Sequence, residues 1–339
     1  MRCLVVGGTG FLGGAIADAL IDAGHSVAIL SRGETDRVSR ASAEIIQADR
    51  YGPLDALGGY AFDWVFDSCA YSPDALTSLL PALGDGVGRY VLISSISAYG
   101  TFRTKGLDET ADVPGATEDD LEVAAGLPPE RRASAFAYGA SYGPLKRACE
   151  VAAEDVLGDR ATSLRVGLLV GAGDYTDRLT WWVRRIDTAR GERRTIPAPA
   201  PEDRPVQLID VRDAAEFAVL CASDGLAGIW NVTGAPVPFS EVLHAIRDLS
   251  QSEAAFVWVD EEKIARSDVA PWVDIPMMAP PLSDFRYFLE VSTAKATAAG
   301  LICRPLKETL APLLDWDLGR REVDLKGGMS AEQEERLLV

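Results

Sequence analysis

Short apolar runs alternate along the first half of the chain with stretches whose apolar residues recur every three or four positions. The runs are the length of buried strands, and they predict strands at residues 4–6, 26–30, 44–47, 64–66, 90–93 and 163–170. Helical spacing follows the first run and ends at Gly24, and it recurs over 142–157, where Gly158 ends it. Strands that alternate with helices predict an α/β fold with a doubly wound parallel sheet of the Rossmann type.

The pattern changes in the second half of the chain. It predicts helices at 175–194, 213–222, 240–249 and 306–314, strands at 206–209, 229–232 and 256–259, an extended proline-rich connector at 196–205, and a last helix near 331. These shorter elements indicate a smaller, mixed α/β lobe. We therefore expect one domain over 1–170 and a lobe over 171–339, with 206–232 as a candidate to return to the first domain. The acidic stretch 101–132 is either a lid over a site or a solvated insertion.

A glycine-rich turn joins the first predicted strand to the first predicted helix. Gly7, Gly10 and Gly13 let the backbone turn tightly and approach a ligand, and the helix N-terminus offers unpaired N–H groups to an anion. Because a second strand follows at βαβ spacing, the turn predicts a dinucleotide cradle. The first domain is therefore expected to bind a dinucleotide, and the lobe to bind a substrate.

Composition narrows the class of protein. The 339 residues are 47% hydrophobic and 25% charged, and the net charge of −18 argues against nucleic-acid or anionic-membrane partners. Five scattered cysteines and two distant histidines predict reduced thiols and no metal site. Without a long apolar run or a signal-like N-terminus, we expect a cytoplasmic protein that binds neither nucleic acid nor membrane.

A candidate acid–base group stands at the start of the 142–157 helix. Tyr142 and Lys146 are four residues apart and so share one face of it. A lysine ammonium close by favours the phenolate and would lower the tyrosine pKa toward neutrality. A serine from the cluster after the fifth strand would bind the substrate oxygen. The alternative is an ordinary pair on a helix surface.

With these motifs the sequence resembles the short-chain dehydrogenase/reductase superfamily, in the extended or atypical branch that contains nucleotide-sugar epimerases and dehydratases. The resemblance spans nearly the whole chain and rests on residues 7–13, 94–100, 142–146 and 209–213 and on the tail from 291 to 316. It implies an oxidoreductase that binds a small-molecule substrate, and by analogy a homodimer.

The resemblance also assigns roles to residues. It implies Ser95 as the catalytic serine, with Ser97 as the weaker candidate, Tyr142 as the acid/base, and Lys146 as its partner and a ligand of the nicotinamide ribose. The remaining cofactor-binding residues that it implies are those of the pyrophosphate loop, the adenine contact, the walls of the cleft and the nicotinamide contacts: Gly7, Thr9, Gly10, Phe11, Leu12, Gly13, Asp49, Cys69, Ala70, Gly167 and Leu168.

Two departures from the family pattern bear on the ligands. Where NAD-selective members carry an acidic residue, about 20 residues past the glycines, this chain has Ser31 and Arg32, which suit a 2′-phosphate and predict NADP(H) over NAD(H). Leu168 stands where nucleotide-sugar enzymes carry a phosphate-binding asparagine, which argues against a nucleotide sugar. Arg178 is a candidate substrate ligand. With Arg184 and Arg185 it forms either an anion site or a solvated helix face.

The sequence thus predicts an NADP(H)-dependent oxidoreductase that transfers a hydride between nicotinamide and a carbonyl or alcohol carbon. The first alternative is an NAD-dependent sugar epimerase or dehydratase, in which the hydride returns to the same substrate. The second is a non-catalytic, dinucleotide-binding protein with a regulatory or nucleic-acid-associated role, and the Tyr142–Lys146–Ser95 set and the acidity of the chain argue against it.

Overall fold

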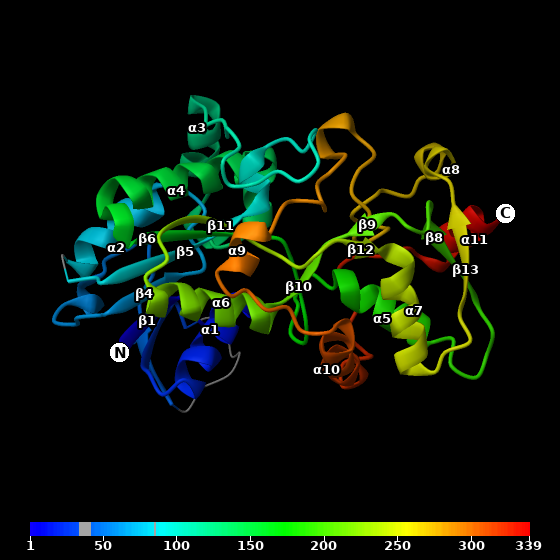
Figure 1. The fold of residues 1–339 in the computed structure, drawn as a ribbon, viewed down its shortest axis with the longest axis horizontal. Helices are drawn as coiled ribbons and strands as arrows, with labels where there is room; N and C mark the ends of the chain where they lie inside the picture. The colour runs from blue at the N-terminus through cyan, green and yellow to red at the C-terminus, as the bar shows by residue number, and fades with distance from the viewer. Residues whose placement is uncertain (34–41, 85) are drawn as a thin grey trace.

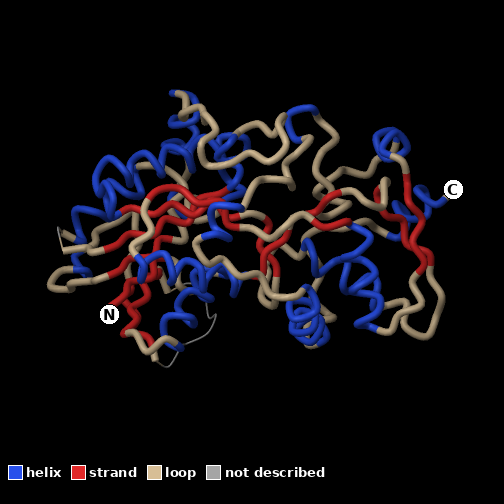
Figure 2. The backbone as a smooth tube through the Cα atoms, in the orientation of Figure 1, coloured by secondary structure: helices blue, strands red, loops and turns tan. Residues whose placement is uncertain are grey.

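The computed structural model describes residues 1–33, 42–84 and 86–339, and its centre is a seven-stranded parallel sheet (Figures 1 and 2). The strand order is β11-β6-β5-β4-β1-β2-β3, and each neighbouring pair is parallel. The bounds are Arg2–Val6 (β1), Ser26–Ser31 (β2), Ala43–Gln47 (β3), Trp64–Asp67 (β4), Arg89–Ser95 (β5), Ala161–Val166 (β6) and Gly228–Val232 (β11). The predicted Rossmann-type α/β class is confirmed. Because the order reverses between β1 and β4, a crevice is expected at their carboxyl ends.

Helices cover both faces of the sheet because alternate strand residues point to opposite sides. On one face, Val5 packs against α1 (Phe11–Asp22) and α6 (Val211–Asp224); on the other, Leu4 packs with α2 (Asp74–Leu83) and α4 (Tyr142–Leu157). Both side chains are fully buried. The short apolar runs read from the sequence are therefore strands sandwiched between two helical layers.

A separate apolar core holds the second lobe together, at the right of Figure 1. Its main helices are α5 (Arg178–Asp187), α7 (Phe239–Ser250) and α10 (Leu306–Leu318), with β8 (Thr195–Pro199) paired in parallel to β13 (Ala255–Val259). Trp182 is completely buried there, and its indole N–H donates to the Pro276 carbonyl at 2.9 Å. Two shorter helices complete the lobe, α8 (Glu261–Arg266) and α11 (Ala331–Leu338).

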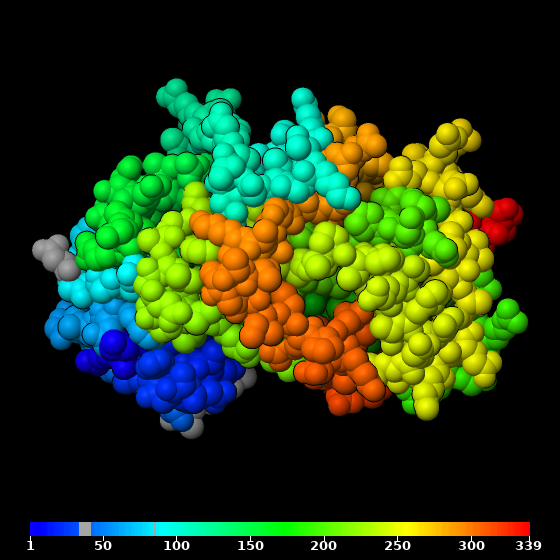
Figure 3. All heavy atoms as spheres, in the orientation of Figure 1, coloured from blue at the N-terminus to red at the C-terminus, as the bar shows by residue number. Residues whose placement is uncertain are grey.

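The chain crosses between the sheet and the lobe several times. After β6 it enters β7 (Leu168–Val170), which pairs with β10 (Leu208–Asp210), and a second small pair joins β9 (Pro205–Val206) to β12 (Val237–Pro238). From β10 the chain returns through α6 to β11 at the sheet edge. Later, the orange segment that contains α9 (Ala294–Ala298) lies between the lime part of the sheet domain and the yellow lobe (Figure 3). A boundary between folding units at 170 stays a prediction.

The 101–132 stretch is mostly exposed, and its one α-helix, α3 (Glu118–Gly126), starts at a capping box formed by Thr117 and Asp120. Its first part packs beside the later chain, as the neighbouring cyan and orange surfaces in Figure 3 show. There the ring of Phe102 lies 4.8 Å from that of Phe288. A short 3₁₀ turn lies within the stretch at Pro129–Arg131, and two more flank it at Ile96–Tyr99 and Ala135–Ser141. Whether it acts as a lid stays a prediction.

Several predicted elements differ from those observed. The helix expected at 175–194 covers only α5, because Asp177 has a left-handed backbone (φ 57°) and the chain after Asp187 turns away. The connector expected at 196–205 contains strand β8, whose alternating prolines leave every second N–H free to pair with β13. The strand expected at 206–209 divides into β9 and β10. Within the described ranges, no helix is both long and apolar enough to cross a bilayer.

Candidate functional site

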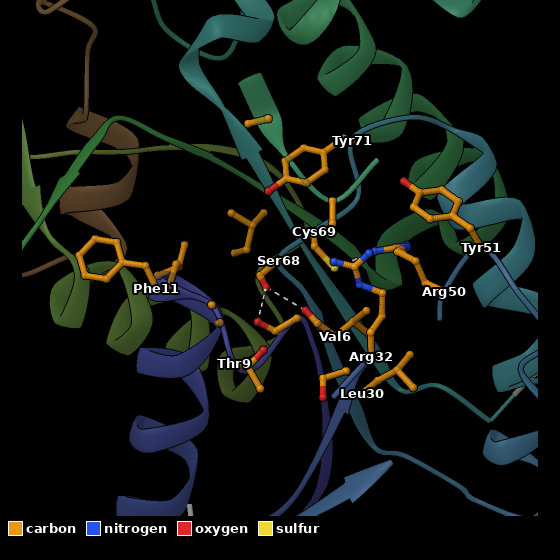
Figure 4. Close-up of a pocket in the computed structure, with 18 of the residues that line it drawn as sticks. Val6, Thr9, Phe11, Leu30, Arg32, Arg50, Tyr51, Ser68, Cys69 and Tyr71 are labelled. Atoms are coloured by element: carbon orange, nitrogen blue, oxygen red, sulfur yellow. Dashed lines mark hydrogen bonds between the residues drawn. The ribbon is translucent and has the colours of Figure 1, made fainter. Parts of the chain in front are cut away.

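A cleft of about 360 Å³ opens at the carboxyl ends of β1 and β4, where the strand order reverses. Its lining comes from the glycine turn, the ends of β2 and β3, the segment after β4, the end of β5, and the start of α4. Figure 4 shows this lining, with Phe11 and Thr9 at one side and Arg50 and Tyr51 at the other. The cleft therefore lies where the sequence places a dinucleotide.

The glycine turn is packed too tightly for side chains. Gly7 has φ +79°, and a Cβ on Gly13 would lie 2.4 Å from the Gly7 carbonyl oxygen and 2.6 Å from Ser68 Oγ. The Ser68 hydroxyl donates to the Val6 carbonyl at 2.8 Å, which ties the end of β4 to the turn (Figure 4). The first amides of α1 consequently stand at the cleft with no side chain in front of them, as a pyrophosphate requires. The cradle fits a dinucleotide.

The far end of the cleft is formed by Ser31, Arg32 and Asp49, as expected for the adenosine side. The Asp49 carboxylate accepts from the Tyr51 N–H at 3.0 Å, and the Arg32 carbonyl accepts from the Gln47 amide at 3.1 Å. Both bonds fix the loop backbone after β2 and β3.

Arg50, which the sequence analysis does not single out, forms a buried ion pair under this end of the cleft. Its guanidinium donates to both Asp67 oxygens, at 2.6 and 2.8 Å, and to the Ala75 carbonyl at 2.8 Å. Tyr90 donates its hydroxyl to the same carboxylate at 2.6 Å. Burial alone would raise the pKa of Asp67, but the Arg50 charge and these hydrogen bonds bring it below its ordinary value. The sequence feature that could have pointed to Arg50 is its position next to Asp49, after the end of a strand.

The predicted catalytic set comes together at the opposite end. Tyr142 and Lys146 line the cleft from the first turns of α4, and Ser95 ends β5 next to Ser94, which lines the same cleft. The Lys146 ammonium is buried and donates to the carbonyls of Ala70 and Ile93, each at 2.7 Å. It lies 5.8 Å from the centre of the Tyr142 ring. A phenol and an ammonium thus meet in one cleft, beside the end of β5.

The ionisation of Tyr142 differs from the expectation. Burial raises its pKa to about 12, and the hydrogen bond with Ser95 opposes this rise only in part. The main cause of the shift is burial, and Lys146 is not among the groups that act on the Tyr142 pKa. The phenol is therefore protonated at neutral pH, the state in which it can give a proton to a carbonyl oxygen.

A buried hydrogen-bond network connects the helix and strands that carry the catalytic set. Glu150, one turn after Lys146 on α4, receives two bonds from Arg165 of β6, at 2.9 and 2.8 Å, and one from the Ser94 hydroxyl at 2.6 Å. Glu150 and Arg165 are each 1% exposed. Because the network joins α4, β5 and β6, it keeps Ser95 and Tyr142 in register.

Several other residues that were expected to contact the cofactor do not line the cleft. Cys69 lines the cleft, but Ala70 is completely buried and contributes its carbonyl to Lys146 instead. Gly167 packs against Thr233, and Leu168 turns into the apolar core of the lobe, whereas their neighbours Val166 and Leu169 face the cleft. β6 ends at Val166 and β7 begins at Leu168, so the strand alternation is interrupted at Gly167 and different residues face the cleft.

Ser97 and the three arginines of α5 have separate surroundings. The Ser97 N–H donates to Ser95 Oγ at 3.1 Å, so Ser97 supports the serine turn. Arg184 binds Asp317 at 2.6 Å, and Arg185 binds Glu334 at 2.5 Å. These two arginines tie the C-terminal segments to α5, which leaves only Arg178 of the three as a candidate for a ligand.

Comparisons with known proteins agree with this architecture. The family model described as "NAD dependent epimerase/dehydratase family" matches residues 3–233. A UDP-glucose 4-epimerase structure superposes with a TM-score of 0.68 at 16% identity, over 96% of this chain and 99% of the other. A UDP-N-acetylglucosamine 4-epimerase from Methanobrevibacter ruminantium, in complex with UDP-N-acetylmuramic acid, gives 0.66 at 18% identity, over 94% and 98%.

A third structure, the Thermus thermophilus UDP-glucose 4-epimerase complex with NAD, gives a TM-score of 0.58 at 21% identity, over 94% of this chain and 100% of the other. At such identities the structures show a shared fold alone. The search among curated proteins finds no match.

Proposed function

Because the chain belongs to the NAD dependent epimerase/dehydratase family, a family of enzymes, we propose that it catalyses hydride transfer at an alcohol or carbonyl carbon of a small-molecule substrate. The bound dinucleotide would supply or take up the hydride. The observation that carries the proposal is that Tyr142 and Lys146 line the same cleft as the glycine cradle.

Each residue of the catalytic set has a distinct task in this proposal. Tyr142 exchanges a proton with the substrate oxygen, and Ser95 holds that oxygen by a hydrogen bond. Lys146 lies beside the phenol, and with two of its N–H groups on backbone carbonyls it keeps one for a ribose hydroxyl. Ser97 positions Ser95 rather than the substrate.

This catalytic set is compatible with two types of reaction, which differ in where the hydride ends. The family match and the structural neighbours favour an epimerase or dehydratase, in which the hydride returns to the substrate. Net reduction by NADPH is the second candidate, favoured by the protonated state of Tyr142 and by Arg32 at the adenosine end of the cleft. An enzyme that retains its dinucleotide through purification and shows no net nicotinamide turnover would support the first type; steady NADPH consumption with a carbonyl panel would support the second.

The proposed preference between NADPH and NADH rests on the residues at the end of β2. Ser31 and Arg32 both line the cleft there, and a guanidinium pairs with a 2′-phosphate, whereas a carboxylate at this place would repel it. We expect NADPH to bind at least about tenfold more tightly than NADH, a preference that Arg32→Ala removes. Equal affinities in fluorescence titrations of the wild-type protein would contradict the preference while leaving the hydride-transfer proposal intact.

The decisive experiment for the proposed function is Tyr142→Phe. It removes the proton-exchanging hydroxyl but keeps the ring, so dinucleotide affinity should stay unchanged while turnover falls by about a hundredfold or more. Tyr60→Phe is the matched control, since its hydroxyl contacts exposed Glu44 far from the cleft. Turnover by Tyr142→Phe close to that of the wild type would refute the role. A homodimer and a cytoplasmic location stay predictions.

A further inference from the structure

Arg178 differs from the other arginines of α5 in having no acidic partner. Arg184 and Arg185 are each committed to a carboxylate. Throughout 1–33, 42–84 and 86–339, no hydrogen bond or ion pair reaches the Arg178 guanidinium. The side chain is nevertheless partly buried, a placement that arginine rarely adopts without a partner.

Two aromatic rings hold this guanidinium. Its central carbon lies 4.9 Å from the centre of the Trp272 ring and 6.0 Å from that of Phe136. Such contacts are made with the flat face of a guanidinium and leave its N–H edges available. Phe136 precedes α4 in the sheet domain, whereas Trp272 belongs to the lobe, so Arg178 stands where the two meet.

The nearest acidic group does not neutralise Arg178. Asp174 interacts with it electrostatically, yet Asp174 Oδ1 accepts from the Thr176 N–H and hydroxyl, at 2.8 and 2.7 Å. Its other oxygen is buried without a hydrogen-bond partner among the described residues. The guanidinium also acts on Tyr142, whose pKa its charge helps to lower against the effect of burial. Tyr175, three residues before Arg178, and Ala135, next to Phe136, line the same cleft as Tyr142, so Arg178 stands beside the cleft of the acid–base residue.

The backbone at Trp272 is an independent sign of a site. Its φ of +72° lies in the left-handed region, which a bulky side chain seldom adopts. Its N–H donates to the Ile275 carbonyl at 3.1 Å, which fixes the turn and the ring beside Arg178. Outliers of this kind cluster at ligand clamps and active sites.

We propose that Arg178 binds one carboxylate of a flat, largely apolar substrate whose reacting carbon lies at Tyr142. The inference rests on the proposed function and names its substrate class. A carboxylate matches the planar N–H edge of a guanidinium, and the rings of Phe136 and Trp272 suit an aromatic or unsaturated skeleton.

Charge counting argues against a nucleotide diphosphate at this place. A diphosphate carries at least two negative charges, and further cations of the lobe are already paired: Arg184 with Asp317, Arg204 with Glu261, and Arg320 with Asp177. Arg178 is the partly buried cation at the two rings, and a single guanidinium there matches a single anionic group.

The test measures binding rather than turnover, on the full chain saturated with NADP⁺. The probe is 4-acetylbenzoate, which combines a ketone, an aromatic ring and a carboxylate; its methyl ester lacks the charge. Calorimetric titration should show 4-acetylbenzoate binding at least about tenfold more tightly than the ester. Arg178→Met should abolish that difference, and Arg178→Lys should restore part of it. The control is Arg286→Met, an exposed arginine that contacts only the Tyr287 ring.

Three results would overturn the inference: no binding of 4-acetylbenzoate to the wild type, an Arg178→Met affinity within roughly twofold of the wild type, or tighter binding of UDP-glucose than of 4-acetylbenzoate. Retained thermal stability of Arg178→Met shows that the variant is folded. Failure of the proposed function is seen separately, because Tyr142→Phe would then retain turnover while the dependence of binding on Arg178 persisted.

Discussion

Replacing Arg50 by methionine tests the buried charge pair beneath the cleft. The Arg50 guanidinium is 7% exposed and the Asp67 carboxylate is fully buried, so the substitution leaves a buried carboxylate without its cation. Only the Tyr90 hydroxyl and the Cys69 N–H would still donate to it. Removing one partner of such a pair costs about 3–5 kcal/mol. At ~2–4 °C per kcal/mol, the melting temperature should fall by roughly 6 to 20 °C.

The pH dependence separates a charge effect from a packing effect. In the wild type the pKa of Asp67 is below its ordinary value of 3.8, so its contribution to stability is present above that pH and is lost as the pH falls further. In Arg50→Met, burial without a cation raises the pKa of Asp67. The stability deficit should therefore be largest at and above neutral pH and should shrink as the pH falls and the folded variant takes up a proton.

Circular dichroism during thermal and urea unfolding measures both effects. The double variant Arg50→Met/Asp67→Asn should recover much of the loss, because no charge is then buried. Arg2→Met is the matched control: its pair with Glu44 is 42% and 49% exposed and should contribute less than about 1 kcal/mol. A loss below about 1 kcal/mol for Arg50→Met, or a deficit that grows as the pH falls, would refute the reasoning.

Three further predictions concern the cradle, the lobe and alkaline pH. Gly13→Ala should weaken dinucleotide binding at least about tenfold in a fluorescence titration, because its Cβ meets the Gly7 oxygen, whereas Gly115→Ala, with no atom within 4 Å, should not. Asp317→Ala strips Arg184 of its buried carboxylate and should cost about 3 kcal/mol in urea unfolding; the exposed Asp248→Ala should cost almost nothing. Burial raises the pKa of Tyr90 and Tyr142, so stability should hold below pH 10, where unfolded tyrosine is neutral, and fall between pH 10 and 12; melting temperatures that stay constant across this window would contradict that.

The sequence alone indicated those features whose pattern is set by neighbouring residues with a clear period or a glycine turn. The run Leu4 to Val6 is apolar because a central strand is covered on both faces, and the glycines after it are required by a turn that admits no Cβ. The spacing of Tyr142 and Lys146 places both on one face of α4 wherever that helix packs. The fold class was therefore predictable, as was the place of the glycine turn and of the Tyr142–Lys146 pair at one cleft, since helical and strand periods are local properties.

Only the tertiary structure decided what each polar group meets. Arg184 and Arg178 lie six residues apart on one helix, yet one reaches Asp317 across 133 positions of sequence and the other rests on Trp272. The sign of the Tyr142 pKa shift depends on its burial, which the surrounding elements impose. No periodicity encodes such pairings, because they arise where distant segments cross, and burial and partner together determine the charge and reactivity of a side chain.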